Sequence, residues 1–137
     1  MKYEKVDKIS EGAFGFIEKV VDENGHFYAR KVLHKQRQRD NIYKLVKKRF
    51  FDEVTYMTNN QHPNISEIII SNVEDVRPCY IMPIAEASMR DDLEKIKEDT
   101  KLATIALYDI LTGLEYVHKS GYYHRCTSSG LFGHLSP

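Results

Sequence analysis

Tryptophan is absent from this sequence of 137 residues, cysteine occurs only twice, and the net charge is zero. Cys79 and Cys126 lie far apart, which excludes a disulfide framework and a paired-cysteine metal motif. His124 and His134 flank Cys126, but their spacing fits no tetrahedral zinc site and a fourth ligand is missing. We therefore expect reduced thiols and no bound metal.

The sequence also lacks an excess of either charge and a long apolar run, which bears on binding to nucleic acid and to membranes. The numbers of basic and acidic residues are equal, 20 of each, so there is no overall attraction for nucleic acid or for an anionic membrane. No stretch approaches the roughly 20 apolar residues of a membrane helix, and no apolar run follows the basic residues at the start. We expect no nucleic acid, no membrane and a cytoplasmic location.

What the sequence does contain begins with the pattern of an antiparallel sheet. β-favouring residues predominate over residues 3–33, where Asn24-Gly25 favours a tight hairpin turn. Two more β-like runs, at Ser66–Val73 and Cys79–Ile84, follow a turn at His62-Pro63-Asn64 and would complete the sheet.

Helical periodicity appears in three other segments. Over Asn41–Asn59 an apolar stripe at i, i+4 and i+7 is formed by Phe50, Val54 and Met57. A short helix is predicted near Met89–Ile96 and a long one over about Thr100–His118. Strands followed by helices predict an α+β fold.

The segment Ile9-Ser10-Glu11-Gly12-Ala13-Phe14-Gly15-Phe16-Ile17 contains the first candidate binding feature. Glycine allows a backbone to approach a phosphate without a Cβ in the way. Strand rather than helix is expected after the glycines, which disfavours a dinucleotide-binding motif. An ordinary turn between two strands is the alternative.

Three charged or small residues form the second feature. Ala29 and Lys31, in Tyr28-Ala29-Arg30-Lys31, share one face of their strand by alternation. Glu53 lies beside the apolar stripe of its helix, where a charge requires a partner. The alternatives are a solvated strand lysine and an ordinary helix carboxylate.

These segments, together with Tyr80-Ile81-Met82-Pro83-Ile84-Ala85-Glu86, resemble the signatures of eukaryotic-like protein kinases in order and spacing over Tyr3–Arg125. The resemblance implies a kinase-like small lobe with hinge over residues 1–85, built from a five-stranded antiparallel sheet and one packed helix. The first helices of an incomplete helical large lobe would follow over residues 86–125, and a tail outside the family pattern over 126–137. The implied family function is ATP-dependent phosphorylation of protein serine, threonine or tyrosine.

The resemblance also assigns an ATP site. Lys31 would contact the phosphates, Glu53 would orient Lys31, and Met82 would line the back of the adenine pocket. The last segment could instead be a plain edge strand, to which Pro83 is equally suited. The full set implied to bind ATP is Ile9, Gly12, Phe14, Gly15, Ile17, Ala29, Lys31, Glu53, Met82, Pro83 and Ala85.

The resemblance fails at the catalytic loop. Tyr122-Tyr123-His124-Arg125 leads into it, but Cys126 stands where the family has its catalytic aspartate. No metal-binding asparagine and no Asp-Phe-Gly follow, so no catalytic residue and no Mg²⁺ ligand is assigned. We attribute the abrupt loss to a frameshift, an alternative exon or an early stop, and expect no independent phosphoryl transfer.

A non-catalytic, pseudokinase-type binding module is therefore the alternative function. Without the rest of the large lobe, the helix at residues 100–118 would expose apolar side chains, among them Ile105, Leu111 and Leu114. This predicts self-association or a protein partner at that helix, or else marginal stability.

Overall fold

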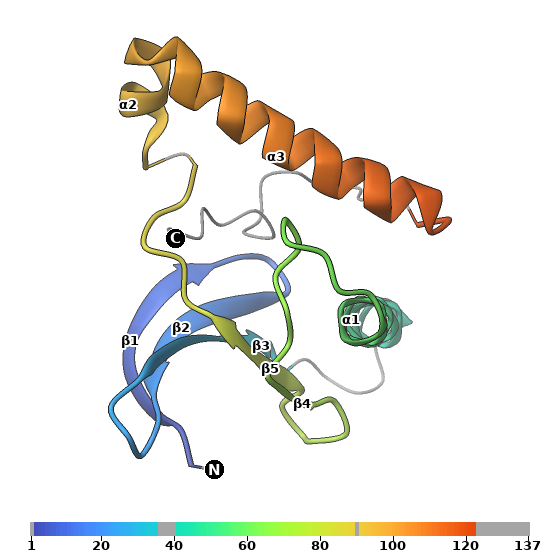
Figure 1. Cartoon of the computed structure of the whole chain (residues 1–137). Coiled ribbons are helices and arrows are strands. Elements are labelled where there is room, and N and C mark those ends of the chain that lie inside the picture. Colours follow the sequence, from blue (N-terminus) through green and yellow to red (C-terminus); the bar gives the residue numbers. More distant parts are fainter. Residues whose placement is uncertain (1, 36–40, 90, 123–137) are drawn as a thin grey trace. The chain divides into compact units, whose positions relative to one another are not determined.

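The structure is a computed structural model that describes residues 2–35, 41–89 and 91–122 (Figure 1). These residues form two compact units. The first comprises the described residues up to Asn60 together with Glu67–Ile84, and the second comprises Gln61–Ser66 and the described residues from Ala85 onward.

The first unit is built on an antiparallel sheet of five strands in the order β1-β2-β3-β5-β4. The strands are β1 (Glu4–Glu11), β2 (Gly15–Val21), β3 (Phe27–Leu33), β4 (Ile70–Asn72) and β5 (Cys79–Pro83). The predicted five-stranded antiparallel sheet is thus confirmed.

The hairpin between β2 and β3 has a local cause in its turn residues. Gly25 has φ 86°, a left-handed conformation that suits glycine. The buried Asp22 carboxylate accepts hydrogen bonds from the backbone N–H groups of Asn24 and His26, each at 2.9 Å. The turn therefore fixes the register that places β3 beside β2.

The helix α1 (Asn41–Asn59) packs against the sheet face that carries Ala29 and Lys31. Its bounds match the prediction from periodicity, and the predicted stripe of Phe50, Val54 and Met57 is 3–5% exposed. The core shared by sheet and helix is a cluster of eight buried residues: Ala29, Leu33, Tyr43, Val46, Phe50, Val54, Tyr80 and Met82.

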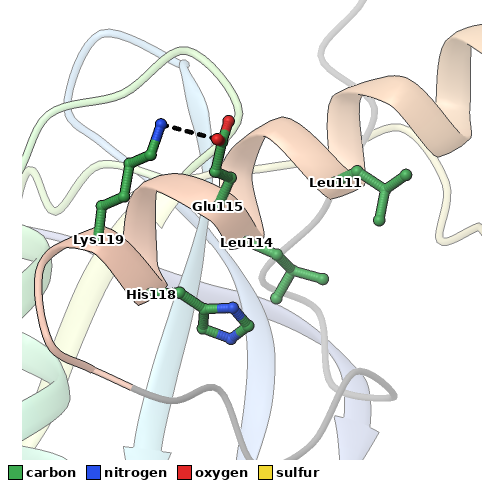
Figure 2. A pocket seen from close by; sticks show the side chains of 5 residues that line it. All are labelled: Leu111, Leu114, Glu115, His118 and Lys119. Atoms are coloured by element: carbon green, nitrogen blue, oxygen red, sulfur yellow. Dashed lines mark ion pairs between the residues drawn. The ribbon is translucent and has the colours of Figure 1, made fainter.

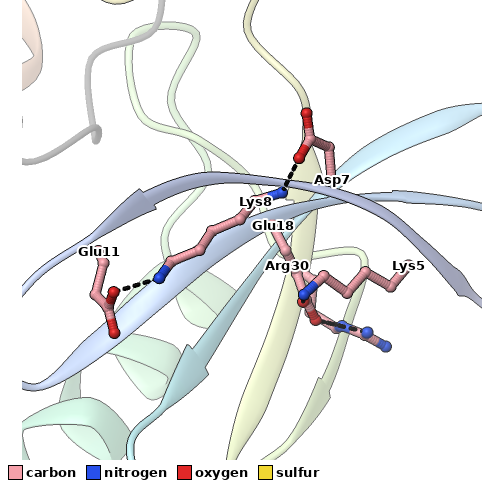
Figure 3. A network of polar contacts seen from close by, with 6 residues as sticks. All are labelled: Lys5, Asp7, Lys8, Glu11, Glu18 and Arg30. Atoms are coloured by element: carbon pink, nitrogen blue, oxygen red, sulfur yellow. Dashed lines mark hydrogen bonds and ion pairs between the residues drawn. The ribbon is translucent and has the colours of Figure 1, made fainter.

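The opposite sheet face contains a buried charge that the sequence analysis did not anticipate. Glu18 on β2 is only 4% exposed and lies directly opposite Arg30 on β3. The guanidinium of Arg30 binds the Glu18 carboxylate at 2.6 Å, and Lys5 approaches the other carboxylate oxygen at 3.5 Å (Figure 3). A second pair, Lys8 with Glu11, lies along β1 and is exposed.

Two elements differ in extent from the prediction. The run at Ser66–Val73 forms a strand only over Ile70–Asn72, and Ser66 belongs to the second unit. Just before β4, the Ile69 N–H donates to the Ile81 carbonyl at 2.8 Å. The short helix α2 (Leu93–Glu98) begins later than expected. Ser88 accounts for the delay, since its carbonyl and side chain bind Asp91 in a separate turn.

The second unit consists of α2, α3 (Thr100–Lys119) and the short segment Gln61–Ser66. The Asp99 side chain caps α3 by accepting from two backbone N–H groups of its first turn. Asn64 donates to the Asp109 carbonyl at 2.9 Å, and the His62 ring lies 4.8 Å from the Tyr116 ring. These contacts fasten the short segment to α3.

Much of the apolar surface of α3 is exposed, as predicted. Ile105 is 45% and Leu111 55% exposed, whereas Leu114 is half-buried. Gly113 is the one buried residue among those described in this helix. In the described part of the chain, neither α3 nor any other helix has the length and hydropathy needed to span a membrane.

Candidate functional site

The candidate site is centred on an ion pair between β3 and α1. Lys31 Nζ lies 2.7 Å from Glu53 Oε1 and 3.0 Å from Oε2, so it donates to both carboxylate oxygens. The side chains are 31% and 26% exposed, respectively. The partner that Glu53 requires is therefore Lys31, and the predicted pairing of these two residues is present in the fold.

Tyr80 is a third member of this cluster, and the sequence analysis missed it. Its hydroxyl donates to Glu53 Oε1 at 2.9 Å, and the residue is only 1% exposed. Burial, reinforced by the negative charge of Glu53, raises the pKa of Tyr80 well above its ordinary value, so the phenol stays protonated and remains a donor. Strand register could have found it, since Tyr80 lies opposite Lys31 once Met82 is paired with Ala29.

The two glycines between β1 and β2 have different surroundings. A Cβ built on Gly15 would lie 2.4 Å from the Val32 carbonyl oxygen, so β2 can approach β3 here only because residue 15 is glycine. A Cβ on Gly12 would meet nothing closer than the Gly15 carbonyl oxygen at 3.9 Å. Gly15 is thus required by the sheet, whereas the space beside Gly12 is open.

This difference predicts opposite results for two alanine substitutions. Gly15→Ala should lower the free energy of unfolding by about 1–3 kcal/mol, because the new methyl group overlaps the β3 backbone. Gly12→Ala should change it by less than about 0.5 kcal/mol. Urea denaturation followed by circular dichroism measures both, since the chain has no tryptophan to report by fluorescence. Equal losses in the two variants would contradict the assigned roles.

Hydrogen bonds connect the glycine segment to the end of β3. The backbone N–H of Gly12 donates to the Gly15 carbonyl at 2.8 Å, and that of His34 donates to the Phe14 carbonyl at 2.9 Å. The Nε2 atom of His34 also lies 3.1 Å from the Gly12 carbonyl oxygen. Phe14 in this turn and Ile9 on β1 are both exposed.

The predicted adenine-side residues lie on the same sheet face as Lys31. Ala29 and Met82 are register partners on β3 and β5, and Ile17 on β2 is the register partner of Lys31. Ala29 and Met82 are buried in the core cluster, and Ile17 packs against that cluster. An apolar surface therefore adjoins the ammonium group.

Pro83 is the last residue of β5 and lies opposite Tyr28 on β3. The interpretation of residues 80–86 as a plain edge strand is wrong, because β5 lies between β3 and β4. Proline has no N–H to donate. It fits at this point because β4 pairs with β5 only as far as Ile81, so no β4 carbonyl requires a donor from residue 83.

The remaining predicted positions lie elsewhere. Ala85 belongs to the second unit. Cys126, which stands at the position of the family's catalytic aspartate, and the histidines at 124 and 134 lie outside the described residues. Within residues 2–35, 41–89 and 91–122, no three His, Cys, Asp or Glu side chains are grouped as metal ligands.

Comparison with known proteins identifies the relatives of this sequence. A family model described as protein kinase domain matches residues 3–126. Similar proteins include a probable serine/threonine-protein kinase of Dictyostelium discoideum, 27% identical over 90% of this chain and 24% of its own length. A tyrosine-protein kinase receptor of Caenorhabditis elegans is 24% identical over 98% of this chain and 13% of its own length. The mitogen-activated protein kinase mpkC of Aspergillus oryzae is 26% identical over 90% of this chain and 36% of its own length. The chain thus spans well under two thirds of each of these relatives.

Proposed function

This chain belongs to the protein kinase family, and we propose that its sheet unit binds ATP, with Lys31 contacting the phosphates and Glu53 holding that lysine in place. The observation that supports the proposal is the ion pair itself. The ammonium group is held at 2.7 Å by a carboxylate, and the Lys31 side chain as a whole is 31% exposed rather than buried in the core. A fixed cation on a glycine-containing sheet face is suited to a phosphate group.

The described residues fit the different parts of an ATP molecule. The open space beside Gly12 would let the backbone of the β1–β2 turn come close to the phosphates. The partly buried Ile17 would offer apolar surface to the adenine ring, with the buried Ala29 and Met82 behind it, and the Pro83 carbonyl would accept from the adenine amino group. Ile9, Phe14 and Gly15 would complete the cover on the β1–β2 side.

Bound ATP would supply a transferable phosphoryl group, which the family generally passes to a protein hydroxyl with the help of Mg²⁺. The described residues contribute binding and charge neutralisation to that chemistry. Because Cys126 stands in the sequence where the family has its catalytic aspartate, our proposal for this chain is ATP binding without phosphoryl transfer.

Titration of the full chain with ATP tests this proposal. Binding to the folded state alone raises the free energy of unfolding by RT ln(1 + [L]/Kd), about 2.7 kcal/mol at a hundred-fold excess over Kd. ATP should raise the melting temperature with or without Mg²⁺, whereas adenosine and tripolyphosphate, each lacking half of the ligand, should raise it less. Absence of any shift at millimolar ATP would exclude the site.

A second candidate function, a non-catalytic interaction module, is supported by α3. Leu111 and Leu114 line a shallow depression on this helix together with Glu115, His118 and Lys119 (Figure 2). Glu115 and Lys119 are paired at 2.7 Å and are both more than 60% exposed. Such a surface is self-complementary. Across a two-fold axis, Glu115 of one copy can pair with Lys119 of the other, beside the apolar strip. The occupant we propose is therefore a second copy of this chain.

Sedimentation equilibrium distinguishes this module from a monomeric ATP-binding unit. The full chain should dimerise, and Leu111→Lys should shift it toward the monomer, because a charge would replace a 55% exposed leucine at the contact. The matched control is Val76→Lys, which changes a 62% exposed valine in the sheet unit. A monomer at all concentrations, or equal effects of both substitutions, would contradict the interface.

A further inference from the structure

We propose that Tyr80 is a positioning residue whose hydroxyl keeps the Lys31–Glu53 pair assembled before any nucleotide binds. The inference rests on the proposed function, since it concerns the same ATP site. It adds a third side chain, from a different strand, to a pair that the resemblance describes as lysine and glutamate only. Tyr80 would not touch ATP; it would act through the carboxylate.

The geometry around Glu53 supports this role. Its Oε1 atom accepts from Lys31 Nζ at 2.7 Å and from the Tyr80 hydroxyl at 2.9 Å, while Oε2 accepts from Lys31 at 3.0 Å. Lys31 and Tyr80 are register partners on adjacent strands β3 and β5. Two neighbouring strands of the sheet thus hold one carboxylate of the helix.

The two donors differ in how firmly they are fixed. A lysine ammonium is carried on a flexible four-carbon stem, and Lys31 is 31% exposed. Tyr80 has only two side-chain torsions, is 1% exposed, and packs its ring 5.4 Å from the ring of Phe50 on α1. The tyrosine is therefore the rigid support, and the lysine is the partner that can turn toward a ligand.

The Tyr80 hydroxyl also makes any separation of α1 from the sheet energetically unfavourable. A buried phenol needs an acceptor, and the hydrogen bond that the structure gives it is to Glu53. If α1 moved away from the sheet, both the phenol and the carboxylate would lose a partner, and each would have to find another. The assembled pair is thus favoured in the free protein, which lowers the cost of ordering the site when ATP arrives.

This arrangement leaves Lys31 able to bind phosphate without releasing Glu53. An ammonium group has three N–H donors, and the carboxylate oxygens account for two close contacts. Glu53 keeps the Tyr80 hydrogen bond whichever way the lysine turns. The role of Tyr80 is therefore separate from that of a residue that merely fills the core, which phenylalanine would do equally well.

The test is Tyr80→Phe in the full chain, read out as the rate at which an amine-reactive acylating reagent labels Lys31, quantified by mass spectrometry. Loss of one hydrogen bond to a charged group should loosen the pair and raise that rate about ten-fold. Tyr43→Phe is the matched control, because it removes a hydroxyl from the same core cluster but not from the carboxylate. It should leave the labelling of Lys31 unchanged.

A second background separates positioning from packing. In a Glu53→Ala chain the carboxylate is gone, so adding Tyr80→Phe should change the labelling rate by less than two-fold. An unchanged rate in Tyr80→Phe alone, or the same increase in both backgrounds, would overturn the inference. The ATP dissociation constant is measured in parallel and should increase in Tyr80→Phe. If the unsubstituted chain binds no ATP, the proposed function fails, while the labelling rates still decide the role of Tyr80.

Discussion

Replacing Lys31 by methionine should weaken ATP binding about a hundred-fold, which corresponds to roughly 3 kcal/mol. The substitution keeps most of the aliphatic length but removes the ammonium group that is held at 2.7 Å by Glu53. The phosphates would then face the Glu53 carboxylate with no cation between them, so a favourable contact becomes a repulsive one. Isothermal titration calorimetry with ATP measures the change directly.

The same substitution should have little effect on folding. Lys31 and Glu53 are both about a quarter to a third exposed, and Glu53 keeps its hydrogen bond from Tyr80, so the loss of stability should stay near 1 kcal/mol. Lys48→Met is the matched control, because Lys48 also pairs with an acidic residue of α1 at 2.7 Å but is 70% exposed and is bound to Asp52 rather than to Glu53. Equal weakening of ATP binding in both variants would assign the effect to net charge rather than to the site.

Arg30→Met should produce the largest loss of stability, about 3 kcal/mol or more. The side chain of Glu18 is 5% exposed, and Arg30 supplies its closest cation, at 2.6 Å. Without it the carboxylate keeps only the more distant Lys5, at 3.5 Å, and is left as an undercompensated charge inside the sheet unit. Urea denaturation followed by circular dichroism gives the change in the free energy of unfolding.

A double substitution separates the cost of an unpaired charge from the value of the pair. Glu18→Leu combined with Arg30→Met removes both charges, and its stability should lie within about 1 kcal/mol of the unsubstituted chain. Lys8→Met, which breaks the exposed Lys8–Glu11 pair on β1 of the same sheet, should leave the stability nearly unchanged. A double variant as unstable as Arg30→Met alone would show that packing, not charge burial, explains the loss.

The fold was predictable because periodicity and turn chemistry are local signals. The apolar stripe of Phe50, Val54 and Met57 located α1, and Asn24-Gly25 located the hairpin between β2 and β3. Alternation placed Ala29 and Lys31 on the same sheet face, which is the face that α1 covers. Burial beside the apolar stripe indicated only that Glu53 needs a partner; the resemblance to protein kinases implied that this partner is Lys31, and the use of the pair in binding ATP stays a prediction.

What escaped prediction depends on contacts between strands whose register the sequence does not state. Tyr80 was an ordinary β-favouring residue until β5 was placed beside β3, with Tyr80 opposite Lys31. Glu18 and Arg30 were two charges in strands, and only their register makes them a buried pair. The different roles of Gly12 and Gly15 required knowing that the β3 backbone lies within 2.4 Å of a Cβ built on Gly15.

Gln61–Ser66 belongs to the unit of α3, so neither unit is a single continuous segment of the chain. The backbone passes from one unit to the other after Asn60, returns after Ser66, and leaves again after Ile84. No single cut therefore yields two intact folding units. In a fragment ending at Ile84, His62 would lose its ring contact with Tyr116, and Asn64 would lose its hydrogen bond to Asp109. Limited proteolysis in the stretch between β5 and α2 should accordingly yield two pieces. They should stay associated through the contacts of Gln61–Ser66 with α3 and separate only on denaturation.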